Sequence, residues 1–332
     1  MEKEERVNMT YPEFDLIEEL KDYKNIVVTG HIKPDGDCIG STVALTMYLK
    51  KRLPEAEVFL MLEKPAPCFA YLSGIELIQA DIPLKLEETD ACIVIDTNSG
   101  RIGNAQKYFD VAKKTINIDH HISNEQGTGD LCYVDPKASS ASELIYRMMD
   151  KEYLDDGIAK FLYLGITHDT GVFRFNNTSK DTMNIAAELI TYNFDFSDLL
   201  EKTYYEKTFE QMKTISEIVA NCERHFDSKV VYGYVTYEDF VKKALNPNDF
   251  DGAINELRII QGCECAIFMY PMNEVTIKVS LRSIGSVDVS KISESFGGGG
   301  HKRAAGFFQK AEREALLKDI LDKIHEQTGW TE

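Results

Sequence analysis

The stretch IVVTGHIKPDGDCIGS occupies residues 26–41 and determines how the first part of this chain folds. Its apolar start, residues 26–29, predicts a buried strand. A polar loop with one histidine and two aspartates follows, and apolar residues at helical spacing then predict a helix over 39–53. A strand, a polar loop and a helix in this order are typical of an α/β fold.

The same alternation continues through the N-terminal half of the chain. Further buried strands are predicted at 58–62, 91–95 and 115–118, and helices at 158–165, at 182–192 and after the capping box Ser140-x-x-Glu143. This order predicts a doubly wound domain with a parallel sheet.

A second, smaller α/β pattern follows after a mainly helical and polar stretch. Its strands are predicted at 230–235, 265–270 and 274–282, and its helices at 237–245, 289–295 and 311–327. We therefore predict a first domain over 1–195, a helical connector over 196–225 and a second domain over 226–332.

Composition narrows the class of protein. The chain has 332 residues, 43% of them hydrophobic, and no apolar run approaches the roughly 20 residues of a membrane span. Its seven cysteines include no C-x-x-C pair, so neither a disulfide framework nor a thiolate zinc site is indicated. The formal charge of −18 opposes binding to long nucleic acid. A soluble cytoplasmic protein without membrane contact is expected.

Acids and histidines follow the predicted strands. His31 comes after the first strand and Asp96 after the third, while Asp119-His120-His121 ends the fourth. In open α/β sheets, ligands bind in the crevice at the carboxyl ends of the strands. Carboxylates crowded there would repel one another, and a bound cation is the simplest way to make them compatible.

The donor set indicates which metal is bound. Carboxylates mixed with imidazoles favour manganese, with magnesium and cobalt as alternatives, over a structural zinc ion. Asp35 and Asp37 are two residues apart on an extended loop, so their side chains point the same way and can each reach one of two neighbouring ions. The sequence therefore predicts a centre with two divalent ions.

Four motifs together resemble the DHH phosphoesterase family. They are Gly30-His31-x-x-Pro34-Asp35-Gly36-Asp37-x-x-Gly40-Ser41, Asp119-His120-His121, Asp169-Thr170-Gly171 and the late run Gly297 to Gly300 with His301. The C-terminal part, with Ser280-Leu281-Arg282-Ser283 and Ala304-Ala305-Gly306, resembles the DHH-associated domain of the subgroup that degrades oligoribonucleotides and phosphoadenosine phosphate.

The resemblance implies two ligand sets that share one aspartate. One ion is bound by His31, Asp35 and Asp96, and the other by Asp37, Asp96, His120 and Asp169. Metal ions held in this way acidify a water, and the resulting hydroxide attacks phosphorus. His121 is expected to face the phosphate and Asp119 to orient a histidine, so Asp96, Asp119 and His121 are the predicted catalytic residues.

The resemblance implies that the first domain, 1–195, is catalytic and that the second, 226–332, binds the substrate. It places the active site in the cleft between them. Arg282 can clamp phosphate oxygens and Ser283 offers a hydroxyl. The glycine run, notably Gly299 and Gly300, permits the backbone to approach a phosphate, and His301 follows it. The sequence does not settle the roles of His168 and Arg258.

The predicted function follows from the resemblance. It is manganese-dependent hydrolysis of short oligoribonucleotides to mononucleotides and of 3′-phosphoadenosine 5′-phosphate to AMP. One alternative is hydrolysis of a cyclic dinucleotide such as cyclic di-AMP, or of its linear product, and another is nucleotide sensing without turnover. The expected partners are short RNA or a small nucleotide, and a homodimer is the family-level expectation.

Overall fold

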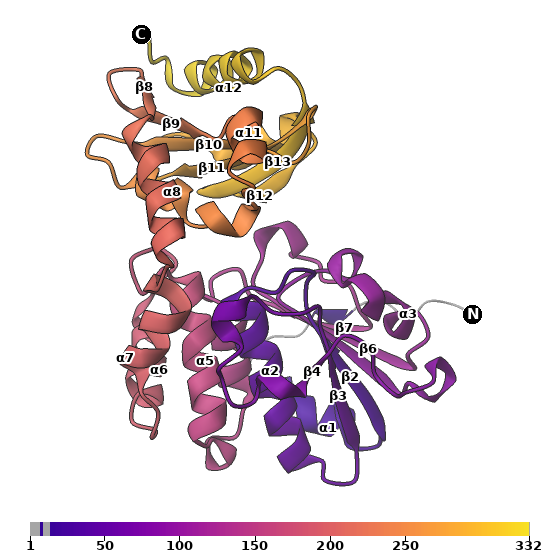
Figure 1. Ribbon diagram of the computed structural model, residues 1–332. Helices are drawn as coiled ribbons and strands as arrows, with labels where there is room; N and C mark the ends of the chain where they lie inside the picture. The colour runs from indigo at the N-terminus through magenta and orange to yellow at the C-terminus, as the bar shows by residue number, and fades with distance from the viewer. Residues whose placement is uncertain (1–6, 9–13, 332) are drawn as a thin grey trace. The chain divides into compact units, whose positions relative to one another are not determined.

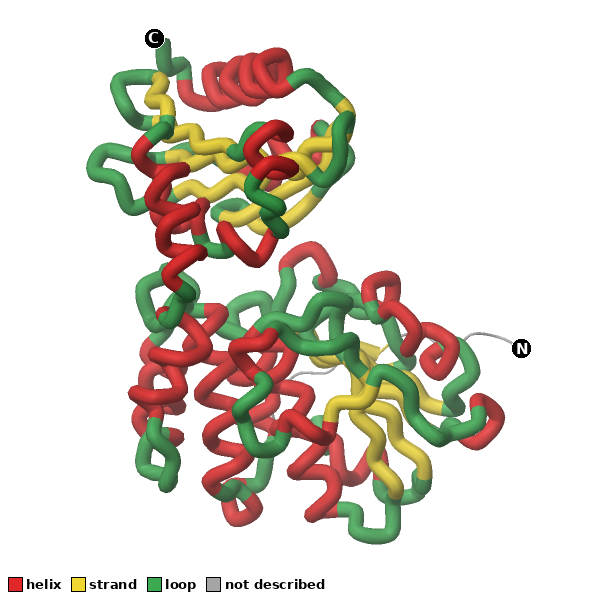
Figure 2. Tube along the Cα trace, viewed as in Figure 1, coloured by secondary structure: helices red, strands yellow, loops and turns green. Residues whose placement is uncertain are grey.

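The computed structural model describes residues 7–8 and 14–331 of the chain (Figure 1). The chain divides into two compact units, one ending at Glu206 and the other beginning at Lys207. Each unit contains a β-sheet with helices packed against it (Figure 2). Among the described residues, every helix is too short or too polar to cross a membrane.

The N-terminal unit is built on a seven-stranded sheet whose pairings are all parallel. In spatial order the strands are β1 (Val7–Asn8), β7 (Leu131–Val134), β6 (Lys114–Asp119), β5 (Ala91–Ile95), β2 (Asn25–Thr29), β3 (Glu57–Met61) and β4 (Ile78–Gln79). The four predicted strands β2, β3, β5 and β6 are confirmed. Between β2 and β5 the strand order changes direction, and such a switch point is where open sheets bind ligands.

Helices cover one face of this sheet. They are α1 (Leu16–Leu20), α2 (Gly36–Arg52), α4 (Ala141–Met148), α5 (Asp156–Asp169), α6 (Lys180–Leu189) and α7 (Phe196–Leu200). Ile26 and Val28 of β2 lie in the core on this face, whereas Val27 faces the opposite side. There, short 3₁₀ turns and α3 (Gln106–Phe109) supply the cover. With both faces covered, the predicted α/β class is confirmed.

Two glycines allow α2 and α5 to cross closely. A Cβ at Gly40 would lie 2.8 Å from the backbone nitrogen of Gly165 on α5, and a Cβ at Gly165 would lie 2.6 Å from Asp37 Oδ1 on α2. Neither position has room for a methyl group. The approach places the first turn of α2 against α5, which ends at Asp169.

The C-terminal unit contains a six-stranded mixed sheet. In spatial order its strands are β12 (Gly299–His301), β13 (Ala304–Lys310), β11 (Thr276–Ser283), β10 (Cys265–Pro271), β9 (Val230–Tyr234) and β8 (Glu223–His225). Only the pairing of β10 with β9 is parallel. The sequence predicted β9, β10 and β11 but missed β8, β12 and β13, which carry few β-branched residues.

Helices lie on both faces of the second sheet. They are α8 (Phe209–Ala220), α9 (Tyr237–Lys242), α10 (Ala253–Arg258), α11 (Val289–Ser295) and α12 (Arg313–Thr328). Residues of α11 and α12 share one core with the sheet, and residues of α8 and α10 share another. The predicted smaller α/β domain is therefore present.

The predicted connector, residues 196–225, does not stand outside the two cores. Leu199 of α7 is buried in the first core, and Ile215 and Ile218 of α8 are buried in the second. The unit boundary falls at Glu206, directly after a π-helical turn over Glu201–Tyr205. The helices of this segment are amphipathic, and their apolar sides join the nearest core.

Candidate metal centre

The candidate site lies at the carboxyl ends of β2 and β5, the two strands at the switch point. His31 comes two residues after β2, and Asp96 comes directly after β5. Asp119 is the last residue of β6, the strand that pairs with β5 on the other side, and His120 directly follows it. Parallel pairing brings these strand ends together, as the sequence motifs predict.

The loop after β2 turns sharply into α2. Asp35 is the N-cap of this helix, and its carboxylate accepts hydrogen bonds from the backbone of Asp37 and Cys38, both at 3.1 Å. Aspartate is favoured at this position because its oxygen satisfies amides that have no partner within the helix. The cap fixes the position of the Asp35 oxygen, which lies 3.6 Å from His31 Nε2.

Asp37 is buried, and the N-terminus of another helix holds it. Its two oxygens accept hydrogen bonds from the backbone of Ala141, at 2.6 Å, and Ser142, at 2.9 Å, in the first turn of α4. These amides favour a negative charge. Burial nevertheless raises the pKa of Asp37 well above its usual value, and the neighbouring Asp96 and Asp169 add to the rise. A bound cation would relieve this repulsion.

Asp96 lies between two histidines. One carboxylate oxygen is 3.5 Å from His31 Nε2, and the other is 3.3 Å from His120 Nε2. Its backbone has φ of 62°, a left-handed conformation that is uncommon for residues other than glycine. Such strain persists only where the surrounding structure enforces it, and it is concentrated at functional sites.

His120 has the least satisfied polar atom among the predicted metal ligands. Its Nε2 atom is buried and makes no hydrogen bond. Three carboxylates surround it: Asp96 and Asp169 each have an oxygen at 3.3 Å, and Asp37 has one at 3.8 Å. A buried nitrogen without a hydrogen bond is costly. A divalent ion shared by this nitrogen and the carboxylates would satisfy both the lone pair and the negative charge.

The structure therefore brings all six predicted ligands to one place. His31, Asp35 and Asp96 lie around one position, and Asp37, His120, Asp169 and again Asp96 lie around another. Each position collects imidazole nitrogen and carboxylate oxygen, the donors that suit manganese and related ions. The donor set fits the predicted pair of divalent ions. Metal binding by these residues stays a prediction.

Asp119 has a different role from the ligands. It is fully buried, and its Oδ1 accepts hydrogen bonds from the backbone of His120, at 2.8 Å, and of His121, at 3.2 Å. The same oxygen is 2.7 Å from His121 Nδ1. Burial would lower the pKa of His121, but Asp119 and then Asp96 raise it. Asp119 thus orients His121 and favours its protonated form.

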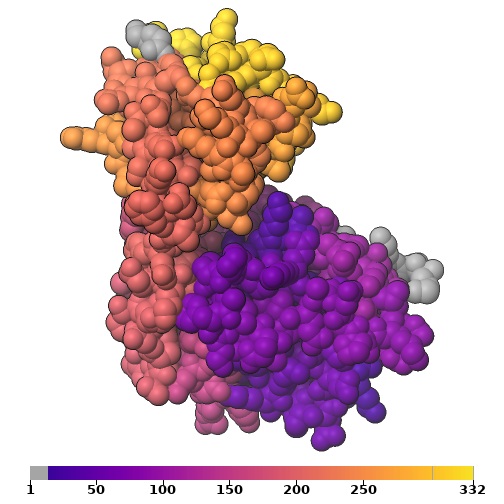
Figure 3. Space-filling model, viewed as in Figure 1, coloured from indigo at the N-terminus to yellow at the C-terminus, as the bar shows by residue number. Residues whose placement is uncertain are grey.

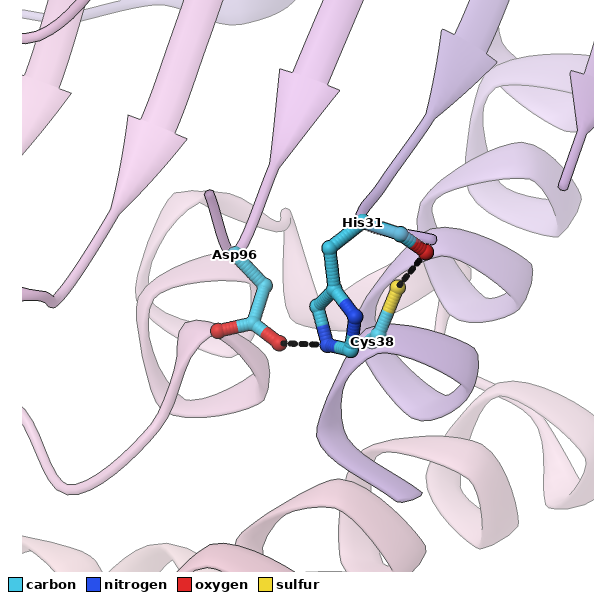
Figure 4. Close-up of side chains that lie close together, drawn as sticks. All are labelled: His31, Cys38 and Asp96. Carbon is cyan, nitrogen blue, oxygen red and sulfur yellow. Dashed lines mark hydrogen bonds and ion pairs between the residues drawn. The ribbon is translucent and has the colours of Figure 1, made fainter. Parts of the chain in front are cut away.

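Cys38 was missed as a neighbour of this centre. Its thiol shares a cluster with His31 and Asp96, a contact that the sequence analysis did not identify (Figure 4). The sulfur packs against Gly30, where a Cβ would overlap it. Burial raises the pKa of the Cys38 thiol well above its usual value.

His168 packs beneath the ligand loop. Its Nε2 lies 3.2 Å from the Thr203 hydroxyl, which itself donates to the Leu199 carbonyl, so the imidazole is the donor. A Cβ at Gly36 would overlap the ring. Burial lowers the pKa of His168 to about 4. These contacts give His168 a packing role and explain why residue 36 is glycine.

The predicted phosphate-binding residues lie in the C-terminal unit. Strand register places Arg282 opposite Ala304, which pairs in turn with His301, so the three positions form one row across β11, β13 and β12. Nη1 of Arg282 donates to the Leu281 carbonyl at 3.1 Å. Because this unit and the first are described separately, the predicted cleft between them stays a prediction.

Ser283 and the glycine run require revision. Ser283 is buried, and its hydroxyl donates to the Val287 carbonyl at 2.8 Å, so it is not presented to a ligand. A Cβ at Gly300 would lie 2.5 Å from the Ala304 carbonyl oxygen, and one at Gly298 would lie 2.5 Å from that of Gly306. Strand packing thus accounts for these two glycines. A Cβ at Gly299 would have nothing within 4 Å, so that position remains open to a ligand.

Comparison with known proteins places the chain in a family. The DHH family, N-terminal domain, matches residues 25–166, and the DHHA1 domain matches residues 227–328. The chain is 31% identical to a bifunctional oligoribonuclease and PAP phosphatase of Bacillus subtilis over 94% of its own length and 99% of that protein. The chain belongs to the DHH family. It is a hydrolase that acts on phosphoester bonds.

Other DHH proteins extend the likeness. A probable bifunctional oligoribonuclease and PAP phosphatase of Streptococcus mutans is 30% identical, with 93% of this chain and 98% of that protein covered. The crystal structure of an exopolyphosphatase-related protein from Bacteroides fragilis has a TM-score of 0.81 and 25% identity, and the match covers 91% of this chain and 92% of that one. The predicted family and fold are therefore confirmed.

Proposed function

We propose that this DHH protein is a hydrolase that uses two divalent metal ions, with manganese as the preferred metal. Its substrates are short oligoribonucleotides, which it hydrolyses to mononucleotides, and 3′-phosphoadenosine 5′-phosphate, which it hydrolyses to AMP. The observation that carries the proposal is the buried His120 nitrogen, which makes no hydrogen bond and lies among three carboxylates. The substrate class rests on the names of the Bacillus and Streptococcus relatives, which match nearly the whole chain.

Six side chains hold the ions in this proposal. Asp96 is the shared ligand, because its two oxygens face His31 on one side and His120 on the other. When bound, the two ions would supply Lewis acidity at the phosphoryl group and lower the pKa of a water molecule, so that hydroxide is available as the nucleophile. The chain contributes a rigid arrangement of ligands: Asp35 is fixed by its capping role, and Asp37 by the amides of α4.

His121 acts on the phosphate in this proposal. Its Nδ1 is held by Asp119 at 2.7 Å, which fixes the plane of the ring. A protonated imidazole in this position donates a hydrogen bond to the developing charge or a proton to the leaving oxygen. Asp119 and Asp96 raise the pKa of His121 against the effect of burial, which favours the protonated ring.

Short substrates suit the electrostatics of the chain. A net charge of −18 offers no basic track for a long polyanion. Recognition is assigned to Arg282 and to the backbone around Gly299, where a Cβ would meet nothing. Two or three phosphates are enough to engage such a site, whereas a long strand would extend over acidic surface.

The test is a comparison of initial hydrolysis rates, with Mn²⁺ and with a chelator, on four substrates. These are an RNA dinucleotide, a five-nucleotide RNA, phosphoadenosine phosphate and cyclic di-AMP. We expect Mn²⁺-dependent turnover that is fastest on the dinucleotide and phosphoadenosine phosphate. Preference for cyclic di-AMP would refute the substrate assignment, and turnover that survives the chelator would refute the metal assignment.

A further inference from the structure

Asn117 is a fully buried polar residue in the middle of β6, next to the candidate metal centre. Its Nδ2 donates two hydrogen bonds, to the Val94 carbonyl at 3.0 Å and to the Thr97 carbonyl at 2.8 Å. Its Oδ1 accepts two, from the Thr128 amide at 3.0 Å and from Asn124 Nδ2 at 2.9 Å. An amide side chain offers two donor hydrogens and two acceptor lone pairs, so every one of them is used.

This pattern fixes the orientation of the amide. The two backbone carbonyl oxygens on one side can only accept hydrogen bonds, so they must face the Nδ2 group of Asn117. The backbone N–H of Thr128 on the other side can only donate, so it must face Oδ1. A flipped amide would oppose like groups at all four contacts. Asn117 therefore has one stable arrangement. No residue of the proposed mechanism explains why a central strand should contain it.

The two carbonyls that Asn117 binds lie on either side of Asp96. Val94 is the last residue but one of β5, and Thr97 comes directly after Asp96. Between them the backbone turns through the left-handed conformation of Asp96, with φ of 62°. The Asn117 amide thus spans a strained turn and holds both of its ends, which keeps the Asp96 carboxylate between His31 and His120.

The other side of Asn117 leads to His121. Asn124 donates both to Asn117 Oδ1 and, at 2.7 Å, to Asp119 Oδ2. Asp119 in turn contacts His121 Nδ1 through its other oxygen. The buried network therefore joins the turn that carries the shared metal ligand to the carboxylate that orients the catalytic imidazole.

We propose that Asn117 is a positioning residue of the hydrolytic centre, which it serves by enforcing the strained turn at Asp96 and, through Asn124, by fixing Asp119. This inference rests on the proposed function, since it concerns the residues that hold the metal. Such outer contacts of metal ligands typically change metal affinity or activity by about 10- to 100-fold.

The strand offers a matched control. Thr115 is also buried and polar, two residues earlier on the same face of β6, and its hydroxyl donates to Asp130 at 2.8 Å. That contact lies at the opposite end of the strand from the metal ligands. Thr115→Ala therefore removes two hydrogen bonds between the same strand and Asp130 without touching the turn at Asp96. Both residues are buried, so they lie beneath the surface atoms that the space-filling view draws (Figure 3).

The experiment measures four proteins: the full chain, Asn117→Ala, Asn124→Ala and Thr115→Ala. Mn²⁺ affinity is measured by titration of the metal-free protein, thermal unfolding is followed without metal, and kcat and KM are determined on an RNA dinucleotide at saturating Mn²⁺. We expect Asn117→Ala to bind Mn²⁺ about 10- to 100-fold more weakly. We expect Asn124→Ala to lower kcat with little change in KM or Mn²⁺ affinity, and Thr115→Ala to lower only the unfolding temperature.

Two outcomes would overturn the inference. One is an Asn117→Ala protein that loses stability as Thr115→Ala does yet binds Mn²⁺ like the unmodified chain. The other is an Asn124→Ala protein with unchanged kcat. If the unmodified chain binds no divalent metal at all, the proposed function fails and this inference with it. If Asn117→Ala does not fold, Asn117→Ser, which retains one donor for the two carbonyls, is measured with the same expectation.

Discussion

Replacing Gly165 by alanine tests whether the packing of two helices places a metal ligand. An alanine Cβ at this position in α5 would overlap the Ser142 hydroxyl and lie 2.6 Å from Asp37 Oδ1. To reach an ordinary contact of 3.4 Å, the Asp37 carboxylate must move by about 0.8 Å. Its hydrogen bonds to Ala141 and Ser142, now 2.6 and 2.9 Å long, would lengthen or break.

Two effects of known size follow from this displacement. Overpacking a dense core costs about 1–3 kcal/mol of unfolding free energy. A metal ligand displaced from its supporting contacts loses about 10- to 100-fold in metal affinity. We therefore expect the Gly165→Ala protein to unfold at lower denaturant concentration and to bind Mn²⁺ correspondingly more weakly. Denaturant titration of the metal-free protein and direct Mn²⁺ titration measure the two effects separately.

The control is Gly157→Ala, in the first turn of the same helix. Its nearest contact would be Asp155 Oδ1 at 3.4 Å, which is ordinary van der Waals distance. Alanine is favoured over glycine in a helix by up to about 1 kcal/mol, so this protein should be as stable as the unmodified chain or more so. If Gly165→Ala binds Mn²⁺ as tightly as Gly157→Ala does, the packing of α5 does not position Asp37 and the reasoning is refuted.

Three further predictions concern the centre and the phosphate-binding row. Asp96→Ala should abolish hydrolysis at every substrate length, because both metal positions lose a ligand. The control is Asp110→Ala, which removes an exposed carboxylate that is hydrogen-bonded to Gln106 and should leave the rate unchanged. Steady-state hydrolysis rates of the two proteins test this prediction. Burial raises the pKa of the Asp169 carboxyl to about 7, so Mn²⁺ must displace a proton from it below that pH. The apparent Mn²⁺ affinity of the protein should therefore rise from pH 6 to pH 8, and an affinity that does not change with pH would contradict this. Arg282→Ala should raise KM. Ser283→Ala should leave KM unchanged and lower the unfolding free energy by about 1 kcal/mol, the value of one buried hydrogen bond. A raised KM in the Ser283→Ala protein would show that Ser283 contacts the substrate.

Much of the N-terminal fold could be predicted because its signals are local. Buried parallel strands are short apolar runs, and β5 begins and ends where its run does. Ser140 caps α4 by accepting the Glu143 amide, as the capping box predicts. Its reciprocal half is absent, because the Glu143 carboxylate instead accepts from Ser139 and Thr182. The second contact joins distant parts of the chain, and no local pattern indicates it.

Polar residues inside a buried strand form the main contacts that the sequence analysis did not predict. The sequence predicts a buried strand at 115–118, yet Thr115, Asn117 and Asp119 form a polar face on β6 that alternates with Ile116 and Ile118. The alternation of polar and apolar residues in this central strand was the sequence signal that could have indicated the hydrogen-bond network around Asn117. The contacts reach Val94 on the neighbouring strand β5 and Asn124 in the loop after β6, and only the folded chain brings these residues together.

The sequence by itself determined which chemical groups this protein brings to its site. Acids and histidines placed at strand ends must meet at one edge of a parallel sheet, because every strand points the same way. The tertiary structure decided what each group does there. The crossing of α2 and α5 places Asp37 beneath the amides of α4, the strained turn makes Asp96 face two histidines, and the packing around Ser283 and His168 removes them from ligand binding. Residue type and spacing are local properties, whereas burial and hydrogen-bond partners depend on elements that are distant in the chain.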